Sequence, residues 1–575
     1  VNTMDIRDNS AKTINVIDTN LANCLDCYRC VRACPVKAIR VTGGHARVVA
    51  ELCIQCGTCV SECPQHAKFI YPSLEEVKTM IASGDRVVAS VAPSFPAAFP
   101  GWRSARIPQA LRRLGFYYVS ETADGAQAIS IESQKQMEAG SIFTACPAVV
   151  RYIEQERPSF LDRMIPVVSP MIGHARILRQ RLGDDIKIVF IGPCAAKKQE
   201  ILRPENKGDV QAVLTFTELV QWFDEEGIDL EECPEESFDG EGGYDLARLF
   251  PLEGGMLKTC GIEADASVGD IVHPCGVTAI QALFDMPASE WNFRAAEPLF
   301  CAGGCIGGPG FPSDCNLFQR RSAVLDYVKQ KSTGLAATQE VYVDLSTSFA
   351  KKVKTLSLSD VSDAEIERVL AETGKAEESE RLNCGACGYR NCREKAAAIA
   401  LGLAEASMCI PQMRRLAERK LDHIIELSPV GIVVLDEDLH IVHMNPAFRD
   451  MFLCTDLVIG REISYLIASD SYEEVARKSD HEVEAVRTKY GKRYHEIVFQ
   501  AEEGNQYIGF YLNLSKIKLD NNQMGLIREQ TVNQAKELLH HQIEFAQNIA
   551  QYLGESTAES EALVKRMIDL YEEKS

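Results

Sequence analysis

Eight of the 21 cysteines in this 575-residue chain lie in two copies of one short pattern. Residues 24–35 read CLDCYRCVRACP and residues 53–64 read CIQCGTCVSECP. This spacing is typical of proteins that bind two 4Fe–4S clusters, in which the fourth cysteine of each copy binds the other cluster. Zinc is the weaker alternative, because a zinc site needs only four ligands. We predict one cluster on Cys24, Cys27, Cys30 and Cys63, and a second on Cys53, Cys56, Cys59 and Cys34.

Four further cysteines lie in three peptides that are far apart in the sequence. They are Cys146 in FTACPAVV, Cys194 in GPCAAKKQE, and Cys301 and Cys305 in LFCAGGCIGGPG. Four thiolates can bind one cubane, and Lys197 could face an anionic ligand of such a group. A lone buried cysteine is more often a small apolar residue, so it is the combination with the repeated pattern that indicates a metal site.

A third group of cysteines lies in the segment NCGACGYRNCREKAAAIALGLAEASMCIP. The alanine-rich stretch favours a helix, which would bring the last cysteine back towards the first three. The segment resembles small 4Fe–4S modules of electron-transfer subunits and corrinoid proteins, although four thiolates also suit zinc. The predicted ligands are Cys384, Cys387, Cys392 and Cys409. The remaining cysteines show no ligand spacing and are interpreted as ordinary thiols: Cys233, Cys260, Cys275, Cys315 and Cys454.

Composition restricts the predicted cellular location of the protein and the classes of ligand that it could bind. The formal net charge is 61 − 82 = −21 with no basic block, which disfavours nucleic-acid binding. No apolar run reaches the roughly 18 residues of a membrane span, and no signal-peptide layout is present, so we predict a cytoplasmic protein without membrane attachment. Because the cytosol keeps thiols reduced, its cysteines are expected to be metal ligands rather than disulfides.

The elements that would position the central cysteines alternate between strand and helix. RVVASV at residues 86–91 and IKIVFI at residues 186–191 read as buried strands, and the second leads directly to Cys194. Residues 211–227 read as a strand followed by a helix. Such alternation predicts an α/β domain whose site lies at the ends of its strands. The glycines of GGCIGGPG would let the backbone approach a bulky cofactor.

Residues 20–330, which contain the repeated pattern and the three distant cysteine peptides, resemble the iron-only (FeFe) hydrogenases. The resemblance implies a two-lobed catalytic domain holding the H-cluster, which is a cubane joined through one cysteine sulfur to a diiron unit with CO, cyanide and azadithiolate. Cys146, Cys194, Cys301 and Cys305 would hold the cubane, and Cys305 would supply the shared sulfur. The chain would then carry four 4Fe–4S clusters, one of them within the H-cluster.

The resemblance also assigns roles around this cofactor. Lys197 would donate a hydrogen bond to a cyanide, with Glu200 supporting its loop. One of the neighbours Lys197 and Lys198 is expected to be in solvent. Further positions expected to line the cofactor are Ala92, Pro93, Ser169, Pro170, Gly192 and Leu299.

Departures from the family pattern concern the proton path. Ala145 occupies the position of a cysteine that passes protons to the bridging amine, and general acid catalysis commonly contributes on the order of 100- to 10,000-fold. We therefore predict slow turnover. Gly192 and Leu299 replace the usual methionines. Glu132 is assigned to one carboxylate of the usual path, with a surface carboxylate as the alternative, and Lys135 falls where the second is expected.

The C-terminal part predicts a sensor. Residues 428–448 read SPVGIVVLDEDLHIVHMNPAF, two strands joined by a tight turn and preceded by a helix, which resembles PAS domains over residues 421–517. His440 and His443 could face a ligand, although surface positions are the more common outcome. Apolar residues spaced seven apart in residues 523–553 indicate a short coiled coil, and so a homodimer through PAS and helices, or else one surface helix.

The predicted architecture is multidomain, α/β and α+β. Its parts are an N-terminal leader (1–19), a two-cluster ferredoxin-like head (20–84), the α/β hydrogenase-like catalytic domain (85–330), a linker region (331–379), the small helical 4Fe–4S module (380–412), a PAS domain with the helix before it (413–519) and a C-terminal helical segment (520–575).

The leading hypothesis is the sensory, PAS-containing subgroup of FeFe hydrogenases. Such a protein would oxidise dihydrogen slowly and reversibly to protons and electrons, and pass its redox state to the PAS domain for signalling. Its partners would be ferredoxin or another redox protein, a separate signalling protein and the hydrogenase maturases. The alternatives are an ordinary ferredoxin-linked hydrogenase and a non-enzymatic iron–sulfur protein without the diiron centre.

Overall fold

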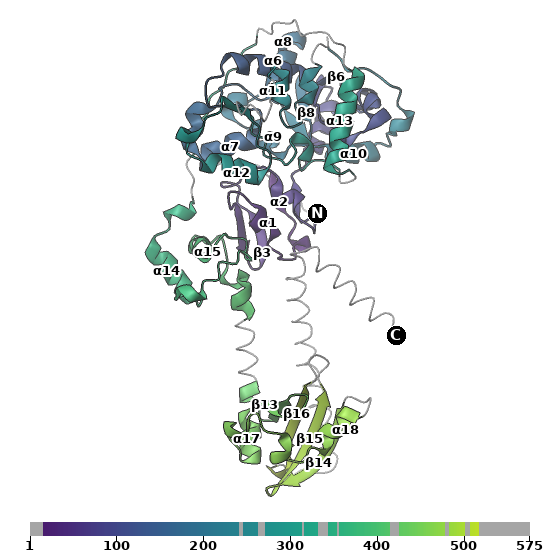
Figure 1. The fold of residues 1–575 in the computed structure, drawn as a ribbon. Helices are drawn as coiled ribbons and strands as arrows, with labels where there is room; N and C mark the ends of the chain where they lie inside the picture. The colour runs from purple at the N-terminus through teal and green to yellow at the C-terminus, as the bar shows by residue number, and fades with distance from the viewer. Residues whose placement is uncertain are drawn as a thin grey trace. The chain divides into compact units, whose positions relative to one another are not determined.

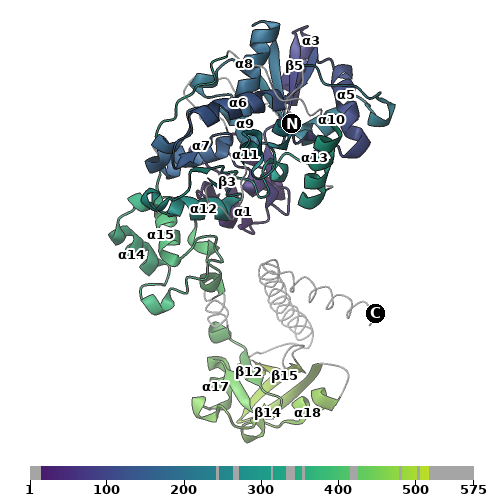
Figure 2. The ribbon, with the colours of Figure 1, turned by 45° about the horizontal axis from the view of Figure 1, so that its top comes forward.

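The protein is described by a computed structural model over residues 15–240, 245–262, 271–312, 315–331, 343–352, 356–414, 425–477, 482–500 and 506–516. The chain forms two compact units, residues 1–409 and 410–575 (Figures 1 and 2). Within the described ranges, no helix is both long enough and apolar enough to cross a membrane.

The head is built from two short antiparallel pairs and two short helices, which repeat like the cysteine pattern. Strand β1 (Ile17–Thr19) pairs with β4 (Lys68–Ile70), and β2 (Ile39–Thr42) pairs with β3 (His45–Val48). Helix α1 (Arg29–Ala33) lies within the first cysteine run, and α2 (Thr58–Ser61) within the second. The pairing of β1 places residues 17–19 in the head, which therefore begins earlier than residue 20.

A four-stranded parallel sheet forms the first half of the central domain. Its order is β6 (Tyr118–Glu121), β5 (Val87–Val91), β8 (Lys187–Ile191) and β9 (Ala212–Leu214). In register, Ala89 of β5 lies between Val119 and Val189. All five residues of β5 are buried, as expected for a parallel strand covered on both faces. The strands expected at residues 86–91 and 186–191 are confirmed.

A second, three-stranded parallel sheet completes the domain. Its order is β10 (Ile271–Val272), β11 (Ala295–Ala296) and β7 (Ser141–Ile142). Around the two sheets lie the helices α3 (Leu74–Ala82), α4 (Phe95–Ala98), α5 (Ile107–Arg113), α6 (Ala123–Lys135), α7 (Pro147–Glu156), α8 (Pro170–Leu182), α9 (Ala195–Glu200), α10 (Phe216–Glu225), α11 (Gly255–Thr259), α12 (Val277–Asp285) and α13 (Leu317–Lys331).

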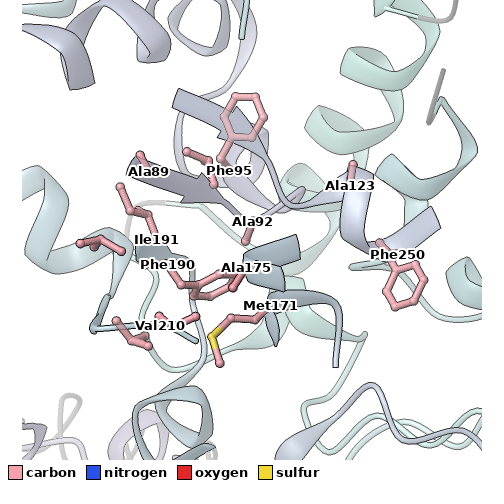
Figure 3. Packing of buried hydrophobic residues seen from close by; sticks show 14 of the residues in the cluster. Ala89, Ala92, Phe95, Ala123, Met171, Ala175, Phe190, Ile191, Val210 and Phe250 are labelled. Carbon is pink, nitrogen blue, oxygen red and sulfur yellow. The ribbon is translucent and has the colours of Figure 1, made fainter. Parts of the chain in front are cut away.

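Helix α3 belongs to the packing of the central domain, although its residues precede 85. Leu74 and Val77 lie in the main apolar core, and Lys198 donates a hydrogen bond to Ser73 Oγ (2.9 Å). The same core surrounds β5 and β8, where Phe190, Met171 and Ala92 converge (Figure 3).

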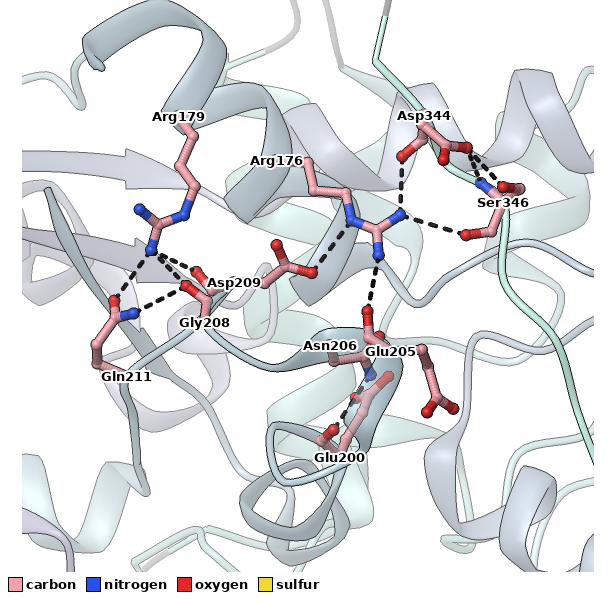
Figure 4. Close-up of polar contacts among 10 residues, drawn as sticks. All are labelled: Arg176, Arg179, Glu200, Glu205, Asn206, Gly208, Asp209, Gln211, Asp344 and Ser346. Carbon is pink, nitrogen blue, oxygen red and sulfur yellow. Dashed lines mark hydrogen bonds and ion pairs between the residues drawn. The ribbon is translucent and has the colours of Figure 1, made fainter. Parts of the chain in front are cut away.

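Part of the segment expected to be a linker packs against the central domain. Arg176 of α8 donates to the backbone oxygens of Asp344 (2.8 Å) and Ser346 (3.3 Å), and its Nε pairs with Asp209 (3.1 Å) (Figure 4). Val168 N also donates to Leu345 O (3.0 Å).

Another part of that segment folds with the third cysteine group. Helix α14 (Asp363–Glu372) buries Ile366, Val369 and Leu370 against two alanines of α15 (Cys392–Ala400). Helix α14 therefore packs on the four-cysteine module, although it precedes residue 380. The module's helix α15 confirms the expected helical stretch after Cys392.

The module docks on the ferredoxin-like head. Four of the hydrogen bonds between them are Arg32 Nη1 to Ala386 O (3.1 Å), Lys37 Nζ to Gly388 O (2.7 Å), Val41 N to Leu403 O (2.9 Å) and Gly43 N to Glu405 Oε1 (2.7 Å). One apolar cluster joins Val31 of the head, Tyr152 of α7 and Tyr389 of the module. Head, central domain and module thus share a continuous core.

The second unit is a five-stranded antiparallel sheet with helices on it. The order is β13 (Ile441–Met444), β12 (Gly431–Leu435), β16 (Tyr507–Asn513), β15 (Lys492–Gln500) and β14 (Glu482–Lys489), with α17 (Pro446–Phe452) and α18 (Asp470–Arg477). Tyr472 and Tyr511 are buried and share a hydrogen bond between their hydroxyls (2.6 Å). His443 is exposed and His440 is 42% exposed beside Asp436, as surface residues would be. The heptad-like residues 523–553 lie outside the described ranges.

Gly57 is where the head meets the loop that carries Cys305. Its φ is +80°, and a Cβ there would lie 2.3 Å from Pro309 Cγ. Gly43 has φ +60° and open space around it, so it shares the backbone strain without the collision.

We predict that Gly57→Ala destabilises the protein by about 1–3 kcal/mol more than Gly43→Ala, because only the first substitution adds overpacking to the strain. Denaturant unfolding followed by tryptophan fluorescence measures the difference, since all three tryptophans lie in the central domain. Equal losses for the two variants would show that the head does not press on Pro309.

Candidate metal centre and active site

The thiols of the head form two groups in which the fourth cysteine is exchanged. Burial raises the pKa of Cys30 to about 11; Lys68 lowers it, and the thiols of Cys27, Cys24 and Cys63 raise it. Burial also raises the pKa of Cys59 well above its usual value, and the thiols that raise it further are those of Cys53, Cys56 and Cys34. The structure thus brings together the two sets that the sequence pattern predicts.

The three distant cysteine peptides converge in the central domain. Each follows the carboxyl end of a parallel strand: Cys146 follows β7, Cys194 follows β8, and Cys301 follows β11. Burial raises the pKa of Cys301 well above its usual value, and the nearby thiols of Cys194, Cys146 and Cys305 raise it further. Strand ends in open α/β sheets commonly form ligand sites, and here they collect four thiols.

Backbone donors at helix starts face these thiols. Cys146 is the N-cap of α7 and Cys194 the N-cap of α9. Burial raises the pKa of Cys146, whereas backbone N–H groups of Phe300, Val149 and Ala148 lower it. Gly304, just before Cys305, has φ +84°, and a Cβ there would lie 2.4 Å from Pro251 O. The positive helix ends favour thiolates, and the glycine lets the loop lie close to its neighbour.

Lys197 places its ammonium beside two of the thiols. Its Nζ donates to Glu200 Oε2 (3.3 Å) and Ser169 Oγ (3.3 Å), and the side chain is 9% exposed. Burial alone lowers the pKa of Lys197, but Glu200 and the thiols of Cys194 and Cys305 raise it above its ordinary value. A buried lysine that keeps its charge is suited to an anionic ligand. Glu200 and Ser169 hold it in place.

The expectation that Lys197 or Lys198 is in solvent is wrong. Lys198 is 6% exposed and pairs with Glu218 (3.0 Å). It faces α3 and α10 rather than the thiols, because consecutive residues of a helix point in different directions. Lys198 therefore ties helices together.

The other lining positions lie at the ends of β5 and β8 and at the start of α8. Ala92 N donates to Ile191 O (2.8 Å), and Pro93 begins the turn after it. A Cβ on Gly192 would lie 2.8 Å from Ala92 Cβ and 2.7 Å from the Phe190 ring, so this ring fills the space next to the glycine. Pro170 is the first residue of α8. Leu299 is buried, and its backbone forms an isolated parallel β-bridge with Cys275.

The two residues assigned to the proton path, Ala145 and Glu132, lie on different segments of the chain. Ala145 adjoins Cys146, is half-buried and packs on the main core. Glu132 lies on α6, where its carboxylate accepts hydrogen bonds from Gln136 (2.6 Å) and Lys135 (3.4 Å). No contact described for Glu132 reaches the four cysteines, and its role in proton transfer stays a prediction.

Glu297 is a buried acid that sequence reasoning missed. Its side chain accepts hydrogen bonds from the backbone N–H groups of Met256 (3.1 Å) and Leu257 (3.3 Å), and it is 2% exposed. Burial raises the pKa of Glu297 to about 8, although the two N–H groups lower it. Glu297 in turn contributes to the raised pKa of Cys305. A lone acid in the apolar run AAEPLF, just before Cys301, was the available signal.

The head and the central site are adjacent. Burial is the main cause of the raised pKa of both Cys56 and Cys301; the thiol of Cys146 raises the pKa of Cys56 further, and the thiol of Cys56 raises that of Cys301. Arg151 of α7 donates to Cys53 O (3.0 Å). One helix therefore carries a thiol of the central site at its start and holds the head's second cysteine group with its next turn.

The third cysteine group is also assembled. Burial raises the pKa of Cys387, backbone and Lys395 contacts lower it, and the thiols of Cys409 and Cys384 raise it. Burial lowers the pKa of Lys395, whereas Cys409 and Cys387 raise it, Lys375 lowers it and Cys392 raises it. All four predicted ligands thus surround one region of the module.

The donor sets fit iron–sulfur clusters. All 21 cysteines are free thiols, so none is used in a disulfide. Clustered thiols whose pKa values are raised by desolvation and by one another resist ionising together until a metal supplies positive charge, and thiolates are the ligands that iron–sulfur clusters use. For the diiron unit, the fitting feature is the charged Lys197 beside Cys305.

Family models match four stretches of the chain. They describe the iron-only hydrogenase large subunit, C-terminal domain (residues 85–309), a 4Fe–4S dicluster domain (16–64), an Fe–S cluster module (380–411) and a PAS domain (419–487). The chain contains an FeFe-hydrogenase-like domain, a 4Fe–4S ferredoxin domain and a PAS domain.

Curated relatives include both hydrogenases and assembly proteins. The NADP-reducing hydrogenase subunit HndD of Solidesulfovibrio fructosivorans is 29% identical over 56% of this chain and 68% of its own length. The periplasmic [Fe] hydrogenase large subunit of Nitratidesulfovibrio vulgaris is 26% identical over 52% and 87%. Cytosolic iron-sulfur assembly component 3 of Mus musculus is 26% identical over 34% and 49%. A solved structure of the [FeFe]-hydrogenase HydA1 from Chlamydomonas reinhardtii aligns with a TM-score of 0.38 and 17% identity, over 49% of this chain and 99% of that one.

The protonated carboxyl of Glu297 gives a pH dependence of stability. Because its folded pKa is about 8 and its ordinary value is 4.5, the native state keeps a proton that the unfolded chain releases. Stability therefore falls as pH rises from about 4.5 to about 8, by an amount on the order of a few kcal/mol.

We expect Glu297→Gln to remove this loss, so that its unfolding temperature declines less than that of the natural protein between pH 5 and pH 9. Calorimetry over this range measures the difference in slope. Glu290→Gln, at an exposed position, is the control and should keep the natural slope. Identical slopes for Glu297→Gln and the natural protein would mean that Glu297 is ionised when folded.

Proposed function

We propose that the chain is a hydrogen-sensing iron-only hydrogenase that oxidises dihydrogen slowly and reversibly. The observation that carries the proposal is the convergence of Cys146, Cys194, Cys301 and Cys305 around the ammonium of Lys197. The similarity of residues 85–309 to the hydrogenase large subunit supports the same conclusion. When bound, the diiron unit would supply the open iron position and the azadithiolate base for splitting dihydrogen.

The protein's own residues would hold and orient that unit. Cys305 would share its sulfur between the cubane and the diiron unit, and Lys197 would donate a hydrogen bond to an anionic cyanide. Glu200 and Ser169 hold the ammonium in one position through hydrogen bonds. Without them the lysine side chain would populate several rotamers. Ala145 can pass no proton, so proton release at this position would be slow.

Electrons would leave through the head, whose second cysteine group adjoins the central site. Ferredoxin or another redox protein would accept them, and hydrogenase maturases would install the diiron unit. Slow turnover together with a PAS domain favours sensing. Reduction can shift the sensor only if its two conformations differ in reduction potential, and a separate signalling protein would receive the output. We further propose a cytoplasmic homodimer formed through PAS and the C-terminal helices.

A second candidate is a non-enzymatic iron–sulfur protein that keeps the cubanes without the diiron unit. The alanine at residue 145 and the similarity to proteins named as cytosolic iron–sulfur assembly components favour it. A third, an ordinary ferredoxin-linked hydrogenase, would require turnover comparable with that of relatives that have the cysteine.

Infrared spectroscopy of protein matured with the hydrogenase maturases separates these candidates. We expect bands from CO and cyanide ligands, and we expect them to shift between argon and dihydrogen. Cys305→Ala is the control, because it should abolish the bands. A fully matured natural protein without such bands would leave only the second candidate.

Ala145→Cys tests the missing proton donor. We expect faster dihydrogen oxidation, by up to about 100- to 10,000-fold if the rest of a path exists, because a thiol at this position can exchange protons. Ala145→Ser is the size-matched control, since its hydroxyl releases a proton far less readily. If the natural protein already turns over as fast as Ala145→Cys, the sensory proposal is wrong.

A further inference from the structure

The third cysteine group has a buried positive environment. Lys375 is 4% exposed, and its Nζ donates to Cys409 Sγ at 3.1 Å. Lys395 is 2% exposed, donates to Ala406 O (3.1 Å) and interacts electrostatically with three of the four thiols. Two lysine side chains are therefore enclosed with one set of four cysteines. Neither lysine has a surface carboxylate as its hydrogen-bond partner in these contacts.

The first cysteine group of the head has a different environment. The thiol of Cys24 lies 3.6 Å from a carboxylate oxygen of Asp26, which also lies 3.2 Å from His45 Nδ1. Lys68 is also buried, at 4% exposure, and interacts electrostatically with Cys30, but its Nζ donates to Thr19 Oγ1 (2.5 Å) and Ala46 O (2.7 Å) and not to a thiol. An acid touches this group directly, whereas a lysine touches the third.

Such charges act on the reduction potential of a cluster. Reduction adds one electron to a centre that its four thiolates already make negative, so a nearby ammonium stabilises the reduced form and a nearby carboxylate destabilises it. The effect is larger in a buried site, where water screens less. Buried Lys375 and Lys395 should raise the potential of the third cluster, and Asp26 should lower that of the first.

Lys37 and Tyr389 connect the head to the third group. Lys37 Nζ donates to Gly388 O (2.7 Å) and lies 5.7 Å from the centre of the Tyr389 ring. Both side chains interact electrostatically with Cys34 of the head's second group and with Cys387 of the third group. An electron on the head's second cluster therefore has two routes, one to the first cluster and one past Tyr389 to the third.

We propose that the cluster of Cys384, Cys387, Cys392 and Cys409 has a higher reduction potential than the first cluster of the head, and that Lys375 and Lys395 make it the preferred acceptor at this branch. In the step, the second head cluster loses one electron and is oxidised, and the third cluster gains it and is reduced. No bond is made or broken. This inference rests on the clusters of the proposed function, but not on its hydrogen chemistry.

The test is a potentiometric titration of the full chain, with clusters reconstituted, dithionite as reductant and electron paramagnetic resonance as readout. The signal of the third cluster is assigned as the one lost in Cys384→Ala. We expect its midpoint potential to lie above that of the first cluster. The opposite order in the natural protein would overturn the proposal, and this holds whether or not a diiron unit is present.

Variants identify the cause. We expect Lys375→Met to lower the midpoint of the third cluster by at least 59 mV, which is a tenfold change in the ratio of reduced to oxidised cluster. Lys375→Arg should restore most of the shift, and Lys329→Met, at a position 77% exposed, should leave it unchanged. Asp26→Asn should raise the midpoint of the first cluster. An unchanged midpoint in a loaded Lys375→Met protein would contradict the role of the ammonium.

If Lys375→Met does not load the third cluster, Lys395→Met gives the same comparison from a residue that does not bond a thiol in the contacts described. Iron content and the remaining signals show which variants are loaded. Loss of hydrogenase activity with the expected order of potentials would reject the proposed enzyme and keep this inference. Hydrogenase activity with the opposite order of potentials would reject this inference and keep the proposed enzyme.

Discussion

Thiols that must lie close together, away from water, are the constraint on which the first unit depends. Each buried thiol raises the pKa of its neighbours, as at Cys59 and Cys301, so the apo sites resist the ionisation that metal binding needs. The fold supplies the opposite influences: backbone N–H groups at helix starts, the ammonium of Lys197 and the cations of the module. Metal then completes sites whose geometry the polypeptide has already set, which couples cluster binding to folding.

The order of the sites along the structure follows from a few contacts. Helix α7 begins directly after Cys146 and contacts the head through Arg151, while Lys37 of the head contacts the module. One continuous apolar cluster also joins these parts, so the distances between sites are set by side-chain packing rather than by flexible linkers. Short, fixed separations are what transfer of single electrons between clusters requires.

Sequence reasoning predicted which thiols of the head the structure brings together, because the patterns at residues 24–35 and 53–64 have short, regular spacing. It also found β5 and β8, whose buried parallel strands read as continuous apolar runs. It misjudged Lys198, because its partner Glu218 lies 20 residues away on another helix. It missed the packing of α14 on α15, because an amphipathic sequence predicts an apolar helix face but not which element covers that face. Such long-range pairings are set by tertiary structure and leave no local pattern.

The apolar cluster shared by head, central domain and module affects how the protein unfolds and is degraded. Val31, Tyr152 and Tyr389 come from all three parts, so none of them can open without exposing the apolar surface of the others. Head, central domain and module should therefore exchange their amide hydrogens and resist proteases as one cooperative body. We therefore expect proteases in the cell to degrade the three parts together, so that stable fragments of them do not accumulate.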